Sequence, residues 1–182
     1  MARVIAIANQ KGGVGKTTTA VNLGASLAAS EQHTLIIDSD PQGNATSALG
    51  FAKDPARRTL YQALILGEPI ERVTIDAQID GLDLIPSDKN LVGAAVELIS
   101  MDNREYRLKE AIAPLREKYD FILIIALRRS TYLPSTRWPP AIQFSFPFSA
   151  SSWRSRESLS YWTLSPGCAA PSILPSRSRE SF

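Results

Sequence analysis

The chain has 182 residues, a formal net charge of +2 and 44% hydrophobic residues, which suits one globular domain with a sizeable core. No segment resembles a signal peptide, and no apolar run approaches the length that spans a bilayer. The single cysteine, Cys168, excludes a disulfide framework and indicates a cytoplasmic protein.

The first predicted elements are a strand, a glycine-rich turn and a helix. Residues 4–8 are apolar and β-branched, residues 9–18 read NQKGGVGKTT, and residues 18–29 favour a helix. Glycines let backbone N–H groups approach an anion, and the helix N-terminus adds a positive field. A phosphate-binding loop is therefore predicted, with a glycine-rich surface turn as the alternative. Its nucleotide-binding residues would be Gly12, Gly13, Val14, Gly15, Lys16, Thr17 and Thr18. Lys16 would reach the β- and γ-phosphates, and the Thr17 hydroxyl would bind Mg²⁺.

This loop departs from the usual G-x-x-x-x-G-K-[ST] pattern, because Gln10 replaces the first glycine and a second lysine, Lys11, precedes Lys16. The segment resembles the deviant Walker A motif, K-G-G-x-G-K-[ST], of the ParA/MinD-type ATPases. The resemblance implies that Lys11 crosses a dimer interface to the partner's nucleotide and that Lys16 is the P-loop lysine. Without the family, Lys11 would be an ordinary solvated lysine in a turn.

A second segment carries two acids directly after a predicted strand, residues 33–38. Acids at a strand's carboxyl end face the ligand crevice of an open α/β sheet, so Asp38 and Asp40 are candidates for Mg²⁺ or water, although turn chemistry also explains them. The string D-x-D-P-Q-G-N at 38–44 resembles switch I of ParA-type partition ATPases. The resemblance implies that Asp40 orients the attacking water and that Asp38 supports the metal.

Further elements continue the α/β alternation. They are a helix over Thr59–Leu66, a strand over Leu82–Pro86, helices over Leu91–Met101 and Arg104–Lys118, and a buried strand over Asp120–Ile124. This order predicts an α/β P-loop fold, a doubly wound and mostly parallel sheet with flanking helices. The family resemblance covers most of residues 1–124.

The composition changes after Ile124. Residues 1–124 carry 13 Lys and Arg against 16 Asp and Glu, a net of −3, whereas residues 125–182 carry 7 against 2, a net of +5. The second part holds 14 Ser, 7 of the 12 Pro and all three Trp, and no helical or strand period persists. One interpretation is a basic nucleic-acid patch at Arg128, Arg129, Arg137 and Trp138. Another is a solvated low-complexity tail.

A third interpretation is a shifted reading frame. In the resembled family this strand ends in the Walker B aspartate, Y-D-F-I-L-I-D-C-x-P, whereas Ile125 occupies that position here. Loss of one base from that aspartate codon would yield Ile124-Ile125-Ala126-Leu127 followed by Arg. The shifted frame over residues 136–164 permits ALAAGDSVLLPVQCEFLALEGVSQLLDT, which is similar to the ParA-type core. We therefore predict that residues 1–124 are the N-terminal part of a ParA-type domain, truncated after Ile124, and that residues 125–182 are an out-of-frame, disordered tail.

The resemblance implies a partition ATPase that binds ATP and Mg²⁺, forms an ATP-sandwich homodimer, binds DNA non-specifically and acts with a ParB-type partner in the cytoplasm, associated with the nucleoid. The chain keeps Lys11, Lys16, Thr17 and Asp40 but lacks the Walker B acid, so we expect no ParB-stimulated ATPase. DNA binding would be lost as well, because Arg128, Arg129 and Arg137 would not be the family's DNA-binding arginines.

Two alternatives stay open. A MinD-like membrane-cycling ATPase would need a C-terminal amphipathic helix, which residues 165–182 do not offer, so no membrane partner is expected. The other alternative is a fragment without function. Iron–sulfur relatives need thiolate ligands, and residues 1–124 contain no cysteine.

Overall fold

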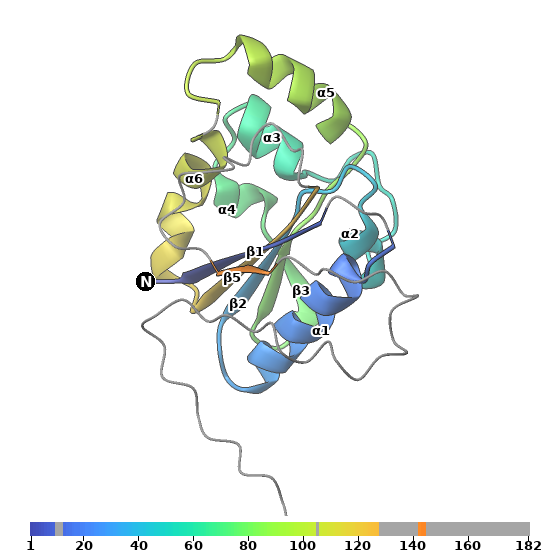
Figure 1. Ribbon diagram of the computed structural model, residues 1–182, viewed down its shortest axis with the longest axis vertical. Coiled ribbons are helices and arrows are strands. Elements are labelled where there is room, and N and C mark those ends of the chain that lie inside the picture. Colours follow the sequence, from blue (N-terminus) through green and yellow to red (C-terminus); the bar gives the residue numbers. More distant parts are fainter. Residues whose placement is uncertain (10–12, 105, 128–141, 145–182) are drawn as a thin grey trace, which may run out of the picture. The chain divides into compact units, whose positions relative to one another are not determined.

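The computed structural model describes residues 1–9, 13–104, 106–127 and 142–144, all within the compact unit Met1–Phe148 (Figure 1). A second unit, Ser149–Phe182, lies outside the described residues, as does most of the tail predicted to be disordered. The same holds for Gln10, Lys11 and Gly12 of the predicted loop. It also holds for the basic residues Arg128, Arg129 and Arg137.

The described part of the chain forms one sheet in the order β3-β4-β2-β5-β1-β6. Its strands are β1 Arg3–Asn9, β2 Thr34–Asp38, β3 Ile75–Ile79, β4 Leu82–Ile85, β5 Phe121–Leu127 and β6 Ile142–Phe144. Every neighbouring pair is parallel except the antiparallel pair β3–β4. This arrangement confirms the predicted α/β class with a mostly parallel sheet.

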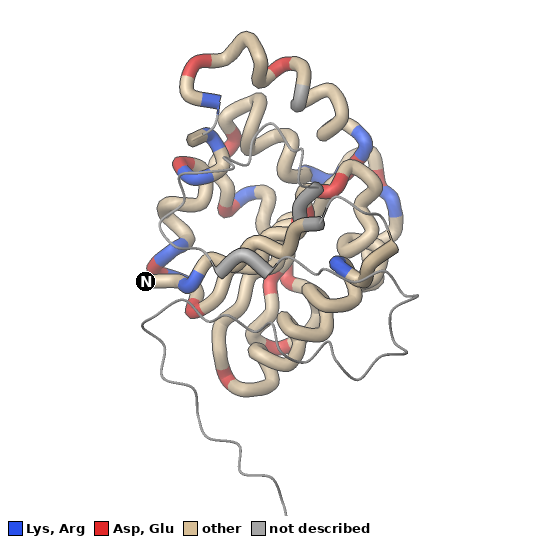
Figure 2. Tube along the Cα trace, in the orientation of Figure 1, with Lys and Arg blue, Asp and Glu red and all other residues tan. Residues whose placement is uncertain are grey.

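Helices cover both faces of the sheet (Figure 1). They are α1 Lys16–Ala29, α2 Asn44–Ala48, α3 Leu60–Ile65, α4 Ile70–Val73, α5 Leu91–Glu97 and α6 Arg107–Ile112, with 3-10 turns η1 Leu98–Ser100 and η2 Ala113–Glu117. The first two pack on one face and the others on the opposite face. Figure 2 shows the charged residues mostly on the outer helices and loops. None of the helices within these described ranges is long and apolar enough to cross a membrane.

The central strands are buried on both faces, which explains their continuous apolar sequence. Every residue of β2 is buried. In β5, Ile122 and Ile124 pack with the α3–α6 layer, and Leu123 and Ile125 pack with the α1–α2 layer. Gly24 lets α1 approach this sheet closely, because it has no side chain. A Cβ at this position would lie only 2.7 Å from Ile36 Cδ1.

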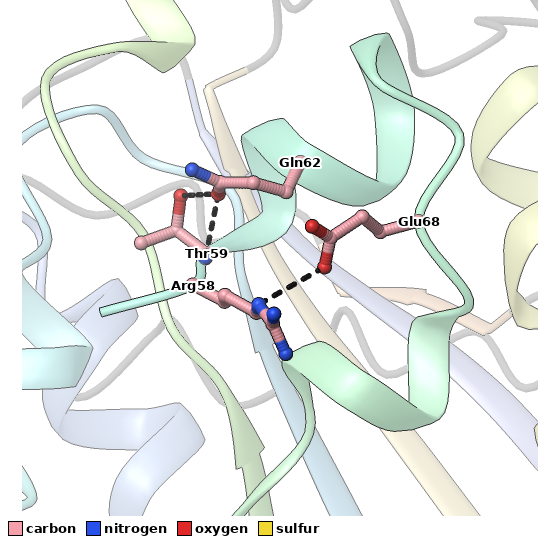
Figure 3. A network of polar contacts seen from close by, with 4 residues as sticks. All are labelled: Arg58, Thr59, Gln62 and Glu68. Atoms are coloured by element: carbon pink, nitrogen blue, oxygen red, sulfur yellow. Dashed lines mark hydrogen bonds and ion pairs between the residues drawn. The ribbon is translucent and has the colours of Figure 1, made fainter. Parts of the chain in front are cut away.

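A polar network fixes the chain at the start of α3 (Figure 3). The Thr59 amide and hydroxyl both donate to Gln62 Oε1, at 2.7 and 2.9 Å. The Gln62 amide is in turn directed at the Thr59 side chain, which completes a capping box. Arg58 Nε and Glu68 Oε2 lie 3.2 Å apart and form an ion pair just outside that cap. The start of α3 is therefore anchored at two points.

Several boundaries differ from the sequence-based expectation. The predicted helix over Leu91–Met101 is α5 followed by η1, and the one over Arg104–Lys118 is α6 followed by η2. Pro114 lies at the start of η2, where its missing N–H ends regular α-helix bonding. Strand β5 continues beyond Ile124 to Leu127, because residues 125–127 are apolar and complete the pairing with β1. Beyond it, the short strand β6 pairs with β1 on its other side.

Candidate functional site

Topology brings the two sequence-predicted segments to the same edge of the sheet. Ile125 on β5 pairs with Ile7 on β1 and with Asp38 on β2, so these three residues lie at one level. With a strand spacing of about 4.8 Å, Ile7 and Asp38 are separated by roughly 10 Å. The chain leaves β1 toward α1 and leaves β2 toward α2, and these two helices contact each other. This edge holds the carboxyl ends of the strands, where ligands bind in open α/β sheets.

The described part of the glycine-rich loop has the backbone of an anion-binding turn. Gly13 and Gly15 have φ angles of 67° and 82°, in the left-handed region that glycine adopts without strain. No other atom lies within 4 Å of where a Cβ would stand on either residue, so conformation and not space requires glycine. Gly15 is also the N-cap of α1, no side chain caps this helix, and its first turn lacks acidic residues. The positive end of this 14-residue helix therefore adjoins the loop, and no residue of its own first turn is acidic.

Lys16 is the first residue of α1, and only 8% of it is exposed. Lysine is rarely so buried, because its ammonium loses hydration. Val14 and Thr17 are half-buried, whereas Thr18 is exposed. Lys16 is therefore buried where the loop meets α1, and Thr17, the next residue, is partly accessible.

Asp38 is fully buried at the end of β2. The Thr46 amide and hydroxyl each donate to its Oδ2 at 2.9 Å, and the Asp40 amide donates to its Oδ1 at 3.2 Å. Burial raises the pKa of Asp38, although the hydrogen bonds from Thr46 and Asp40 act in the opposite direction. Both carboxylate oxygens therefore organise the chain that follows β2. The predicted role of Asp38 as a supporting carboxylate near a metal stays a prediction.

Asp40 is half-buried, and its Oδ1 accepts the amide of Gln42 at 3.0 Å. Among the described residues, no three His, Cys, Asp or Glu side chains gather to hold a metal ion. Proteins commonly hold Mg²⁺ with one or two oxygen ligands of their own, and substrate phosphates and waters complete its shell. Thr17 and Asp40 are the residues that would supply those ligands, and the assignment stays a prediction.

Ile125 occupies the centre of this edge. It is 1% exposed and packs with the α1–α2 layer, the same side toward which Asp38 reaches Thr46. Its carbonyl accepts the Ser39 amide at 3.0 Å and the Ser39 hydroxyl at 2.6 Å. The position between the two candidate segments therefore carries an apolar side chain in place of a carboxylate.

Three residues of this edge were missed by the sequence analysis, namely Ser39, Thr46 and Ser87. Ser87 directly follows β4 and Pro86, so the signal applied to Asp38, a polar residue just past a buried strand, would have found it. Thr46 carries no such signal, because its hydroxyl reaches Asp38 only after the chain has turned through residues 39–45.

A family model described as an AAA domain matches residues 2–126. The chromosome partitioning protein ParA of Myxococcus xanthus is 51% identical over 122 residues, which are 67% of this chain and 43% of that protein. The sporulation initiation inhibitor protein Soj of Bacillus subtilis is 45% identical over 124 residues, 68% of this chain and 49% of that protein. The chain belongs to the ParA/Soj family.

Solved structures of similar proteins have the same fold. Apo McdA of Cyanothece superimposes with a TM-score of 0.68 at 33% identity, covering 72% of this chain and 52% of that one. The cobyrinic acid a,c-diamide synthase of Mycobacterium smegmatis, solved with an ATP analogue and magnesium, gives 0.67 at 35% identity, covering 70% and 52%. The chain spans about half the length of the curated relatives it matches.

Proposed function

We propose that this ParA/Soj-family chain binds ATP and Mg²⁺ as the N-terminal part of a chromosome or plasmid partition ATPase. The observation that carries the proposal is the turn at Gly13 and Gly15, both at positive φ, leading into a helix whose first residue is the buried Lys16. The solved relative that holds an ATP analogue and magnesium supports this choice of ligand.

The proposed roles are supported by this placement and, for Lys11 and Gly12, which lie outside the described residues, by the family motif alone. The amides of residues 12–18 and the Lys16 ammonium bind the β- and γ-phosphates, and the Thr17 hydroxyl binds Mg²⁺. Bound Mg²⁺ would offset negative charge on the phosphates. Asp40 orients the attacking water, and Asp38 supports the metal through the segment that it holds. Lys11 reaches the nucleotide of a partner subunit.

The whole protein's behaviour is a further part of the proposal. An intact relative would dimerise around ATP, bind DNA without sequence preference and respond to a ParB-type partner in the cytoplasm, at the nucleoid. For this chain we propose ATP binding without ParB-stimulated hydrolysis, because Ile125 leaves the strand end without a carboxylate.

We attribute the change after Ile124 to a shifted reading frame. The family model stops at residue 126, close to the point where the composition changes. Sequencing the gene around codon 125 tests this interpretation. One missing base that restores the family pattern supports it, and a confirmed frame with no such restoration contradicts it.

Nucleotide binding to the full chain, measured by calorimetry with ATP and Mg²⁺, tests the function itself. Lys16→Ala should weaken binding by about 2–5 kcal/mol, or roughly 30-fold to several thousand-fold, because it removes a buried cation that faces phosphate. Lys118→Ala is the matched control, since Lys118 is exposed and precedes β5 at the opposite edge of the sheet. Equal affinities for the two variants would contradict binding at this loop.

A further inference from the structure

The switch I segment, residues 38–46, is held from within by one carboxylate. Asp38 accepts the Asp40 amide on one oxygen and two donors of Thr46 on the other. The Gly43 amide donates to the Asp40 carbonyl at 2.9 Å, and the Gln42 amide donates to the Asp40 carboxylate at 3.0 Å. Both the main chain and the side chain of Asp40 therefore have internal partners.

A second set of bonds reaches this segment from another strand. Ser87, which follows β4 and is 7% exposed, donates its hydroxyl to the Asp40 carbonyl at 2.6 Å, across 47 residues of sequence. Its amide donates to the Thr46 hydroxyl oxygen at 3.0 Å. The Thr46 hydroxyl thus accepts from Ser87 and donates to Asp38, so a continuous chain of hydrogen bonds joins β2 with the loop after β4.

Gly43 allows the two loops to approach this closely. Its φ is 62°, and a Cβ there would lie 3.1 Å from the Ser87 carbonyl oxygen. A side chain at this position would meet both a strained backbone and a fixed main-chain atom. The close contact between the segment and Ser87 therefore depends on glycine at position 43.

The loop that carries Ser87 is itself anchored to α3. The Leu60 amide donates to the Pro86 carbonyl at 2.9 Å, and the Thr59 hydroxyl lies 3.2 Å from Asp88 Oδ1. Thr59 belongs to the capping box of Figure 3. Ser87 is thus a fixed point, and the switch I segment is the part that it positions.

We propose that Ser87 and Thr46 are positioning residues, which hold the main chain of Asp40 so that its carboxylate has one orientation before nucleotide binds. The inference rests on the proposed function, in which Asp40 orients the water that attacks ATP. Neither residue needs to touch the nucleotide, because each acts through Asp40 or Asp38. Preorganisation of this kind lowers the cost of reaching the reactive geometry.

The full chain with Ser87→Ala tests the positioning directly. A hydrogen bond worth about 1 kcal/mol corresponds to a roughly fivefold change in an equilibrium. We therefore expect the Gln42 and Gly43 amides to exchange with deuterium about fivefold faster in this variant, without nucleotide. Ser100→Ala is the matched control, because the Ser100 hydroxyl also donates to a main-chain carbonyl, that of Glu97 at 2.8 Å, away from the segment.

Thr46 offers a second pair of variants. Thr46→Val removes the hydroxyl at nearly constant shape and should accelerate the same amides, whereas Thr46→Ser keeps the hydroxyl and should restore slow exchange. Basal ATP turnover and ATP affinity are measured on every variant. Ser87→Ala and Thr46→Val should lower turnover about fivefold and change affinity less than twofold, and Thr46→Ser should recover turnover.

The outcomes separate this proposal from the proposed function. Unchanged exchange at Gln42 and Gly43 in Ser87→Ala overturns the positioning role, and so does wild-type turnover when wild type hydrolyses ATP. If no variant hydrolyses ATP but exchange still distinguishes Ser87→Ala from Ser100→Ala, hydrolysis by this chain is refuted and the positioning of Asp40 stands.

Discussion

Replacing Ile125 by aspartate would restore a carboxylate at the centre of the candidate site. Ile125 pairs with Asp38 across β2 and β5, and both side chains face the α1–α2 layer. The new carboxylate would thus lie next to a buried acid that already accepts three hydrogen bonds. We expect Ile125→Asp to destabilise the protein unless a cation occupies the site.

The size of the effect follows from the strand spacing. Two carboxylates about 5 Å apart repel by about 3 kcal/mol at an effective dielectric constant near 20. Ile125→Asn loses the same buried apolar side chain but adds no charge, so it isolates this term. The Asp variant should therefore be less stable than the Asn variant by about 3 kcal/mol at pH 7.

Urea denaturation followed by circular dichroism measures this difference. In the Asp variant the folded pair binds a proton more tightly than the unfolded chain, so stability should fall as pH rises from the ordinary aspartate pKa toward neutrality. Acidification should bring the two variants together. ATP with Mg²⁺ should stabilise the Asp variant more than the Asn variant, because the cation offsets the paired charge.

Asp and Asn variants of equal stability at pH 7 would mean that position 125 does not face Asp38 as the register indicates. Equal stabilisation of both by ATP with Mg²⁺ would mean that the metal lies elsewhere.

Three other changes test the remaining features. In a chain with its reading frame restored near codon 125, Lys11→Ala should bind ATP but lose the ATP-dependent dimer, and an unchanged dimer in sedimentation would contradict its role across the interface. In the same restored chain, Asp40→Ala should retain ATP affinity and lose ATP turnover, because positioning the water acts in the transition state. Equal turnover in this variant would remove Asp40 from the mechanism. Burial raises the pKa of Tyr119 above its ordinary value of 10. Asp83, which accepts the Tyr119 hydroxyl at 2.5 Å, raises this pKa further. Wild-type stability should therefore fall as pH rises above 10. Tyr119→Phe should cost about 1–2 kcal/mol near neutral pH and remove that alkaline fall, and alkaline unfolding identical to wild type would refute the assignment.

Sequence reasoning succeeded where the signal is local. The strand, glycine turn and helix around Lys16 follow from residues within thirty positions of one another, and so does the acid-bearing end of β2. The hairpin of β3 and β4 was also within reach, because Asp80-Gly81 is a common hairpin turn, yet β3 was not predicted.

Sequence reasoning failed where partners are distant. The bonds from Ser87 to Asp40 and Thr46 depend on the neighbouring position of β2 and β4, which no local pattern reveals. The predicted end of β5 was also wrong. The family pattern led us to expect a break at Ile124, whereas the strand continues to Leu127 along β1.

The place of β5 between β1 and β2 has a consequence for folding during synthesis. The two earlier strands do not pair with each other, so their backbone groups facing the gap lack partners until residues 121–127 have left the ribosome. At about 5–20 residues per second, the interval between Asp38 and Phe121 lasts roughly 4–17 s. During that time each of these strands has an unpaired edge, and such an edge is a template for pairing with another chain.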